Sequence, residues 1–179
     1  MMRKGSLAMR SSWNWFVFLF WCLGLPAAPA QAAPVESWIE ARGILGYSTF
    51  LDESPLHHFV SGGAVRFNLT RRLAVEPEFL SMYRSKRDLG FYLVPNLVFN
   101  LTGRPSRVRP YLIGGVGIAW QRELTGAGYY WSRGLIHSAG FGTRVFLTDR
   151  LYVAPEVRFG WEPVLRVAGS IGYVFSGNE

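Results

Sequence analysis

The sequence predicts an all-β protein in which eight antiparallel strands run up and down and close into a barrel. Apolar and polar residues alternate over stretches of roughly ten residues, the periodicity of strands with two unlike faces. One hairpin also occurs twice: Gly62–Phe79 and Gly140–Val157 match at nine of eighteen positions after a shift of 78. The repeat predicts that the same strand–turn–strand unit is used on two sides of the fold.

The two faces of this hairpin suggest a barrel with its apolar surface outside. In the first copy Val65 and Phe67 share one parity while Arg66 lies on the other, and side chains of opposite parity point to opposite faces. The charged face is also rich in Gly and Ala, as a crowded interior requires, whereas the apolar face carries large residues. This combination favours a transmembrane barrel, apolar toward lipid and polar within. A soluble β protein with a surface of paired charges remains the alternative.

The first 32 residues have the three parts of a cleavable signal peptide. Three basic residues among the first ten precede the short apolar segment Trp13–Leu25, and Ala30–Ala32 fits the small-residue cleavage pattern. The expected domains are therefore a signal peptide at Met1–Ala32 and one barrel domain at residues 33–179. An uncleaved anchor is the alternative.

Removal of this segment limits the chemistry of the mature chain. Cys22 leaves with it, so neither a disulfide nor a thiolate metal site is expected. The formal charge falls from +7 to +4, because three basic residues and no acids are lost. The basicity is thus partly a targeting feature, and no nucleic-acid partner and no cofactor are expected.

The strands of the first half follow from the alternation. The first is expected at Ser37–Tyr47, with Glu40 and Arg42 facing inward. The first copy of the hairpin supplies the second and third strands, with Glu76 and Glu78 inward. The fourth is Leu89–Leu101, whose large apolar residues share one parity.

The second half follows in the same way. The fifth strand is expected at Pro110–Gln121, where small residues mark the inner face. The second hairpin copy supplies the sixth and seventh strands, and the eighth is Val164–Phe175. Proline lacks the N–H that an interior ladder uses, so we expect bulges at three positions: Pro77, Pro95 and Pro155.

The connections fall into two groups. Short turns are expected near Thr70, Gly103 and Asp149. At the other end, the expected loops are Ser48–His57, Arg84–Asp88, Arg122–Ser132 and Glu162–Pro163, which would leave His57 and His58 solvated.

Parity collects nine charged side chains inside the expected barrel: Glu40, Arg42, Arg66, Glu76, Glu78, Arg144, Glu156, Arg158 and Arg166. Enclosed charges must pair and hydrogen-bond to offset desolvation, and the arginine fork suits two carboxylates at once. The hairpins place Arg66 near Glu76 and Glu78, and Arg144 near Glu156. We expect a plug of ion pairs, since eight strands enclose little more than side chains. An ion path or a binding site is the alternative.

The pattern resembles the small eight-stranded outer-membrane β-barrel proteins of Gram-negative bacteria. The resemblance rests on the signal peptide, on Pro110–Gly117 (PYLIGGVG) and on the ending Gly172–Phe175 (GYVF). It implies a cell outer-membrane location, both termini in the periplasm, contact with membrane lipids and lipopolysaccharide, and recognition of the last strand by the barrel-assembly machinery. One departure is that four residues follow Phe175, whereas the family usually ends on the aromatic.

Aromatic side chains gather toward both ends of the expected strands, as membrane interfaces favour. The expected girdle comprises Trp120, Trp131 and Trp161 at one end and Tyr173 and Phe175 at the other.

A catalytic site is not expected. His137 is next to Ser138, but neighbouring strand residues face opposite ways, and no acid shares the face of His137. No metal-binding cluster or nucleotide loop is visible. The expected role is structural or interactive. The alternatives are a lipid A-modifying enzyme and a small, porin-like passive pore, and the oligomeric state stays open.

Overall fold

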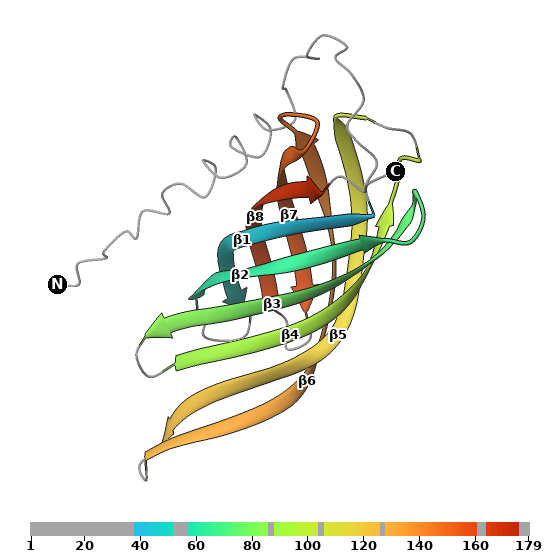
Figure 1. The fold of residues 1–179 in the computed structure, drawn as a ribbon. Helices are drawn as coiled ribbons and strands as arrows, with labels where there is room; N and C mark the ends of the chain where they lie inside the picture. The colour runs from blue at the N-terminus through green and yellow to red at the C-terminus, as the bar shows by residue number, and fades with distance from the viewer. Residues whose placement is uncertain are drawn as a thin grey trace, which may run out of the picture. The chain divides into compact units, whose positions relative to one another are not determined.

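The computed structural model describes residues 38–51, 57–85, 88–103, 106–125, 128–160 and 164–175. These residues form eight strands (Figure 1): β1 (Ile39–Phe50), β2 (His57–Asn68), β3 (Leu73–Ser85), β4 (Asp88–Asn100), β5 (Val108–Thr125), β6 (Gly128–Phe146), β7 (Leu151–Gly160) and β8 (Val164–Phe175). No helix among them is long and apolar enough to cross a membrane. The expected signal peptide, Met1–Ala32, lies outside the described residues.

The strands form one closed barrel in sequence order. Every strand pairs antiparallel with its neighbours, and β1 closes the barrel by pairing with β8 from Ile39↔Phe175 to Phe50↔Val164. The predicted fold class, an all-β up-and-down barrel of eight strands, is therefore confirmed.

The two copies of the repeated hairpin are β2–β3 and β6–β7, and their turns have the same hydrogen bonds. The amide of Thr70 donates to the carbonyl of Leu73 at 3.0 Å, and that of Thr148 to Leu151 at 3.2 Å. The threonine hydroxyl oxygen also accepts from the amide three residues on, at 2.9 Å for Thr70 and 3.0 Å for Thr148. Threonine recurs here because its side chain satisfies turn amides that the ladder does not reach. We call this end of the barrel the turn end, and the opposite end the hairpin end.

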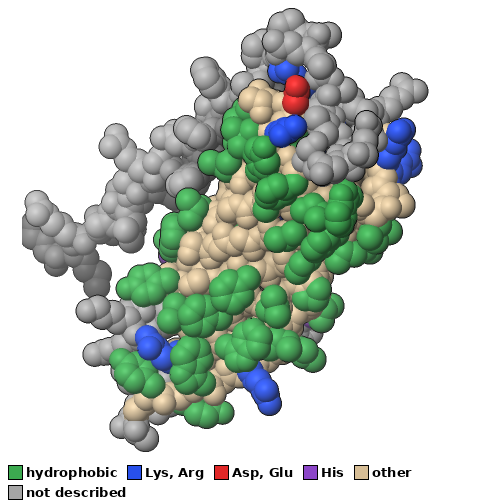
Figure 2. Space-filling view, viewed as in Figure 1, with side chains coloured by type: hydrophobic (Ala, Val, Ile, Leu, Met, Phe, Trp, Pro, Cys, Tyr) green, Lys and Arg blue, Asp and Glu red, His purple; other side chains and the backbone are tan. Residues whose placement is uncertain are grey.

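Side chains alternate between the interior and the outer face along most of the strands, and the exception is the hairpin end of β6, where Gly128, Tyr129, Tyr130 and Trp131 are all exposed. Along β8, exposed Val167, Ile171 and Tyr173 alternate with buried Arg166, Ala168 and Ser170. Large apolar side chains cover the visible outer face (Figure 2). An exposed apolar surface of this extent marks contact with a membrane or a partner rather than with water.

The strands at the hairpin end are longer than expected. The expected loop Arg122–Ser132 is wrong, since β5 continues to Thr125, β6 begins at Gly128, and the pairing reaches Thr125↔Gly128. Figure 1 shows this hairpin extending past the ends of β3 and β4. Gly128 has a φ of 125°, a conformation that side-chain-bearing residues rarely adopt.

The expected loops Ser48–His57 and Arg84–Asp88 are also shorter. β1 runs to Phe50, β2 starts at His57, β3 runs to Ser85 and β4 starts at Asp88. His58 is accordingly buried on the inner face of β2 instead of solvated. Nothing in a single sequence marks where an alternating strand stops if no Gly or Pro interrupts it.

The bulges expected at the three prolines are absent from the described strands. The register is the same before and after Pro77: Ala64 pairs with Glu78 and Phe67 with Val75, and only the two intervening pairs are missing. On its other side Pro77 pairs directly with Pro95, and Pro155 pairs with Gly169. A proline lacks an N–H and cannot donate a backbone hydrogen bond to one of its neighbouring strands. Pairing is therefore lost locally, but no extra residue is inserted into the strand.

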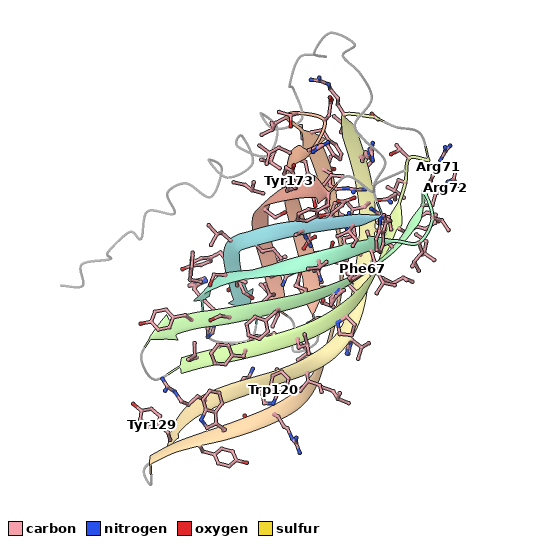
Figure 3. The ribbon with its side chains drawn as sticks, in the orientation of Figure 1. Phe67, Arg71, Arg72, Trp120, Tyr129 and Tyr173 are labelled. Carbon is pink, nitrogen blue, oxygen red and sulfur yellow. The ribbon has the colours of Figure 1, made fainter. Side chains whose placement is uncertain are left out.

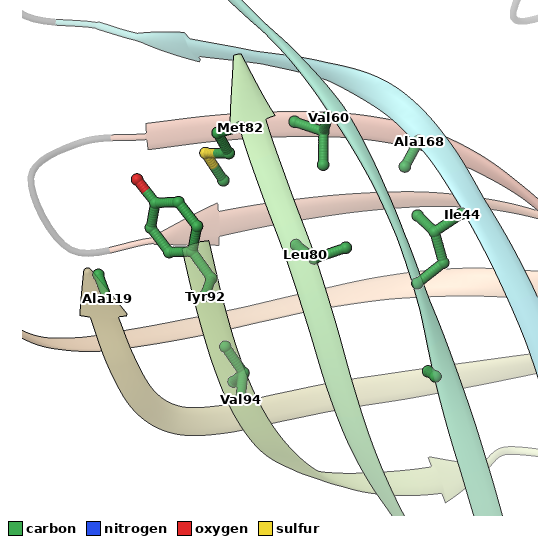
Figure 4. Packing of buried hydrophobic residues seen from close by; sticks show 9 residues of the cluster. Ile44, Val60, Leu80, Met82, Tyr92, Val94, Ala119 and Ala168 are labelled. Carbon is green, nitrogen blue, oxygen red and sulfur yellow. The ribbon is translucent and has the colours of Figure 1, made fainter. Parts of the chain in front are cut away.

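The interior is layered along the barrel axis. On β3, Ala74 is followed by inward-facing Glu76 and Glu78 and then by Leu80, so charged side chains lie between two apolar layers. The layer toward the hairpin end includes Ile44, Val60, Leu80, Met82, Tyr92 and Val94 (Figure 4). Toward the turn end lie two separate apolar clusters, one that includes Tyr111 and one that includes Tyr152.

Candidate functional site

The nine charged residues predicted for the interior are all buried, none more than 6% exposed. They come from six strands: β1, β2, β3, β6, β7 and β8. Each is at an inward position of its strand because the two-residue period leaves one choice once the apolar residues face outward. Their contacts divide them into two groups along the axis, which we call the central network and the turn-end cluster.

Arg42 is the hub of the central network. Its Nη2 donates to Glu76 Oε1 at 2.6 Å and to Glu156 Oε2 at 3.1 Å, and lies 3.5 Å from Glu78 Oε2. Its Nη1 donates to Ser170 Oγ at 3.2 Å. One guanidinium on β1 thus links carboxylates of β3 and β7 across the interior.

Arg158 and Arg166 form the side of the network toward the hairpin end. Arg158 donates through Nη2 to Glu78 at 2.9 Å and through Nε to Glu156 at 2.7 Å. Arg166 bridges the same two carboxylates, at 2.9 Å to Glu78 and 3.1 Å to Glu156. Asn96 Oδ1 accepts from Arg158 Nη1 at 2.8 Å.

Arg66 was expected to lie near both Glu76 and Glu78, and its ion pair is with Glu76. Arg66 Nε donates to Glu76 Oε2 at 2.6 Å, whereas Glu78 is bound by Arg42, Arg158 and Arg166. The Arg66 guanidinium lies over the Tyr111 ring, 4.9 Å from its centroid.

The prediction that Arg144 pairs with Glu156 is wrong. Arg144 Nη1 donates to both oxygens of Glu40, at 2.6 and 2.8 Å, and its Nη2 donates to Asn100 Oδ1 at 2.7 Å. Asn68 completes this turn-end cluster by donating to Glu40 at 2.8 Å. The reason lies in the repeat: where the first copy has Glu76, the second has Ala154, so Arg144 finds no carboxylate at its own level of the hairpin.

Two tyrosines that were not singled out from the sequence also belong to the interior. Tyr111 donates from its hydroxyl to Glu156 Oε2 at 2.8 Å, and Tyr152 lies near Arg144, whose guanidinium carbon is 5.9 Å from the ring centroid. A Cβ placed on Gly142 would overlap Tyr111, and one on Gly172 would overlap Tyr152. Strand parity was the available signal, since both tyrosines share the parity of inward residues.

This arrangement fills the barrel interior with paired charges. All four glutamates accept from at least one arginine, and Glu78 and Glu156 each accept from three. Desolvated charges are tolerated only when paired and hydrogen-bonded in this way. With five arginines against four glutamates, the buried set carries an excess of one positive charge.

Of the five expected girdle residues, Figure 3 labels Trp120 and Tyr173, which lie toward opposite ends of the barrel. Tyr173 and Phe175 are exposed near the turn end, with their rings 5.3 Å apart, and Trp131 is exposed on the β5–β6 hairpin opposite Arg122. Trp120 lies on the same hairpin and is half-buried. Trp161 lies outside the described residues.

The histidines do not assemble a relay among the described side chains. His137 is exposed on the outer face of β6, and Ser138 has the opposite, inward parity. Buried His58 on β2 pairs in register with Ser48 on β1. No group of three or more His, Cys, Asp or Glu in the described part of the chain is arranged to hold a metal ion.

Comparison with known proteins relates the chain to others by fold. No protein-family model and no curated protein matches the sequence. Among solved structures, it is similar to the N-terminal β-barrel domain of Pseudomonas aeruginosa OprF, with a TM-score of 0.64, 13% identity and coverage of 76% of this chain and 96% of that one. It is also similar to Neisserial surface protein A, with a TM-score of 0.63, 9% identity and coverage of 76% and 96%.

A third similar structure is Ail, the attachment invasion locus protein of Yersinia pestis, with a TM-score of 0.51, 13% identity and coverage of 79% of this chain and 100% of that one. All three are small outer-membrane β-barrels of eight strands. The chain therefore has the fold of the small eight-stranded outer-membrane β-barrels, with an Arg/Glu network in its interior.

Proposed function

We propose that the protein is an integral outer-membrane barrel with a structural or interaction role, whose lumen is plugged by the central network and the turn-end cluster. The carrying observation is the set of nine buried charged side chains linked by ion pairs of 2.6–3.5 Å across the interior. A conducting path needs water and mobile ions where these side chains lie. If water took the place of the ion pairs, each charged side chain would be hydrated but would lose its charged partners.

The proposed setting is a lipid bilayer. Its support is the band of exposed apolar side chains on every strand together with the aromatic residues toward both ends. Membrane lipids and lipopolysaccharide are the partners we propose for this surface. The ending Gly172–Phe175, alternating and aromatic, is proposed as the segment that the barrel-assembly machinery reads during insertion.

The proposed role is non-enzymatic. The support is that His137 faces outward from the middle of β6 whereas Ser138 has the opposite parity, so that their side chains leave the strand on opposite faces. The buried glutamates are engaged by arginines, which keeps them from serving as general bases on a bound lipid.

Two measurements on cells test this proposal. Density-gradient fractionation of the cell envelope is expected to recover the protein with the outer membrane. Mass spectrometry of lipid A from cells with and without the protein is expected to give the same acyl pattern.

A matched variant makes the second measurement decisive. His137→Ala removes the only histidine on the outer face of β6 and is expected to leave the lipid A acyl pattern unchanged. A change of one acyl chain that is present with the unmodified protein and lost in His137→Ala would overturn the non-enzymatic role. Recovery of the protein with the inner membrane would overturn the location.

A further inference from the structure

A pocket lies in the interior on the hairpin-end side of the central network. Its walls are mainly apolar and come from β3, β4, β6 and the start of β8: Leu80, Met82, Tyr92, Val94, Ile136 and Val164. Four of these belong to the layer of Figure 4, where Leu80, Met82, Tyr92 and Val94 lie together. Gln121, which also lines the pocket, donates from Nε2 to the Tyr92 hydroxyl oxygen at 3.0 Å.

The bottom of the pocket is charged. Glu78, Arg158 and Arg166 line it, and all three belong to the central network. Arg166 is the most accessible of them, with 8% of its side chain exposed against 2% for Arg158 and none for Glu78. The buried charged set has one arginine more than it has glutamates. An anion at this bottom would therefore balance the interior charge, whereas a cation would add to the excess.

Among the described residues, the β6–β7 ladder ends beside the pocket. β6 pairs with β7 only from Ser138↔Gly160 toward the turn end, while its remaining residues, from Gly128 to His137, pair with β5 alone. Ser138 and Gly160 both line the pocket, and so does His137, although His137 is exposed on the outer face. The pocket thus reaches the outer face where the β6–β7 ladder ends.

We propose that this pocket binds a single-chain anionic amphiphile, such as a fatty-acid carboxylate. The carboxylate lies at Arg166, where a guanidinium can add an acceptor to those it already has. The alkyl chain lies along Leu80, Met82, Val94 and Ile136 and reaches the outer face beside His137. A two-chain phospholipid does not fit this description, since its head group stays at the membrane surface.

Met82 provides a direct probe of occupancy. It is the only methionine in residues 33–179, and its side chain lies in the pocket, with the residue only 8% exposed. Protein labelled with methyl-¹³C methionine, purified from membranes and placed in phosphatidylcholine nanodiscs, is titrated with dodecanoate. The Met82→Leu variant assigns the signal.

Dodecanoate is expected to shift the Met82 methyl resonance in a saturable manner. Dodecanol, which has the same chain without the charge, is expected to bind about tenfold more weakly or worse, because it cannot form charge-assisted bonds to arginine. Nanodiscs with phosphatidylglycerol as the only anion are expected to leave the resonance unchanged.

Two substitutions on one strand separate pocket from surface. Ile136→Trp fills the pocket and is expected to weaken dodecanoate binding at least about tenfold. Leu135→Trp places the same side chain on the outer face, where Leu135 is 78% exposed, and is expected to leave binding unchanged. Val164→Trp, at the edge of the pocket, serves as a second filling variant if Ile136→Trp does not form a barrel.

The unmodified protein alone is enough to overturn the proposal. No Met82 shift with dodecanoate, a shift caused by phosphatidylglycerol alone, or equal affinity for dodecanol would each contradict it. So would binding that persists in both filling variants. These results would not decide whether the lumen is plugged, because closure of the lumen is measured by conductance and does not depend on whether the pocket is occupied.

Discussion

Arg42 of β1 and Glu156 of β7 form an ion pair of 3.1 Å across the barrel interior, although 114 residues separate them in the sequence. The same oxygen of Glu156 accepts from the Tyr111 hydroxyl of β5 at 2.8 Å. Three strands on different sides of the barrel therefore meet at one carboxylate oxygen. We infer that the network stabilises the barrel by joining its walls as well as by filling it.

Neutralising Glu156 is expected to be costly. Glu156→Gln keeps the shape but leaves Arg42, Arg158 and Arg166 with one anion fewer, and breaking a buried pair costs about 3–5 kcal/mol. Asp149→Asn makes the same acid-to-amide change in an exposed turn and is expected to fall within about 0.5 kcal/mol of the unmodified protein. Urea unfolding in lipid vesicles measures both. Equal free energies of unfolding for the two variants would argue against a coupled network.

The pairing of Arg144 with Glu40 is tested by a double-mutant cycle. Arg144→Met and Glu40→Gln remove partners that are in direct contact, so their effects on the unfolding free energy are expected to be non-additive by about 0.5–3 kcal/mol. Arg150→Met, in the exposed turn, combined with Glu40→Gln is expected to be additive. Additivity in the first cycle would mean that the Arg144–Glu40 contact does not contribute to stability.

The outer face is tested by one substitution at two depths on β5. Val116 and Val108 both point outward, but Val116 lies near the middle of the strand and Val108 at its turn end. Val116→Arg is expected to lose about 2–4 kcal/mol and Val108→Arg about 0–1 kcal/mol, because the cost of a cation falls toward the membrane interface. Unfolding in bilayers measures the difference. Equal costs at the two depths would contradict the membrane placement of this face.

Two glycines on β8 test the packing of Tyr152. A Cβ on Gly172 would overlap the Tyr152 ring, whereas a Cβ on outward-facing Gly169 meets nothing within 4 Å. Gly172→Ala is expected to lose about 1–3 kcal/mol through overpacking, and Gly169→Ala is expected to be tolerated. Heat-modifiable gel migration and urea unfolding report barrel formation and stability. A Gly172→Ala barrel as stable as the Gly169→Ala barrel would show that the tyrosine ring can move aside at no cost.

Strand parity was enough to predict which residues face inward. Glu78 and Arg158 belong to different strands, yet each was placed correctly because a two-residue period offers only two faces. The repeated hairpin likewise predicted two equivalent turns, which Thr70 and Thr148 form with the same hydrogen bonds.

The partners of the inward residues did not follow from parity. Arg144 was expected to bind within its own hairpin, but Glu40 on β1 is its partner, because contacts across the lumen depend on the tilt and register of the closed barrel. The long β5–β6 hairpin was missed because its sequence contains loop-forming residues and no signal that the ladder continues. The prediction of bulges at the prolines was wrong because a proline removes one N–H from the ladder but does not insert an extra residue.

The most direct test of the plugged lumen is the conductance of the purified, unmodified protein in a planar lipid bilayer. Insertion is verified separately by heat-modifiable gel migration of the same preparation. Because the central network fills the interior with paired charges, the inserted barrel is expected to show no steady conductance. A stable ohmic conductance would contradict this account, since it would place water and mobile ions where Arg42, Glu78 and Glu156 are in contact.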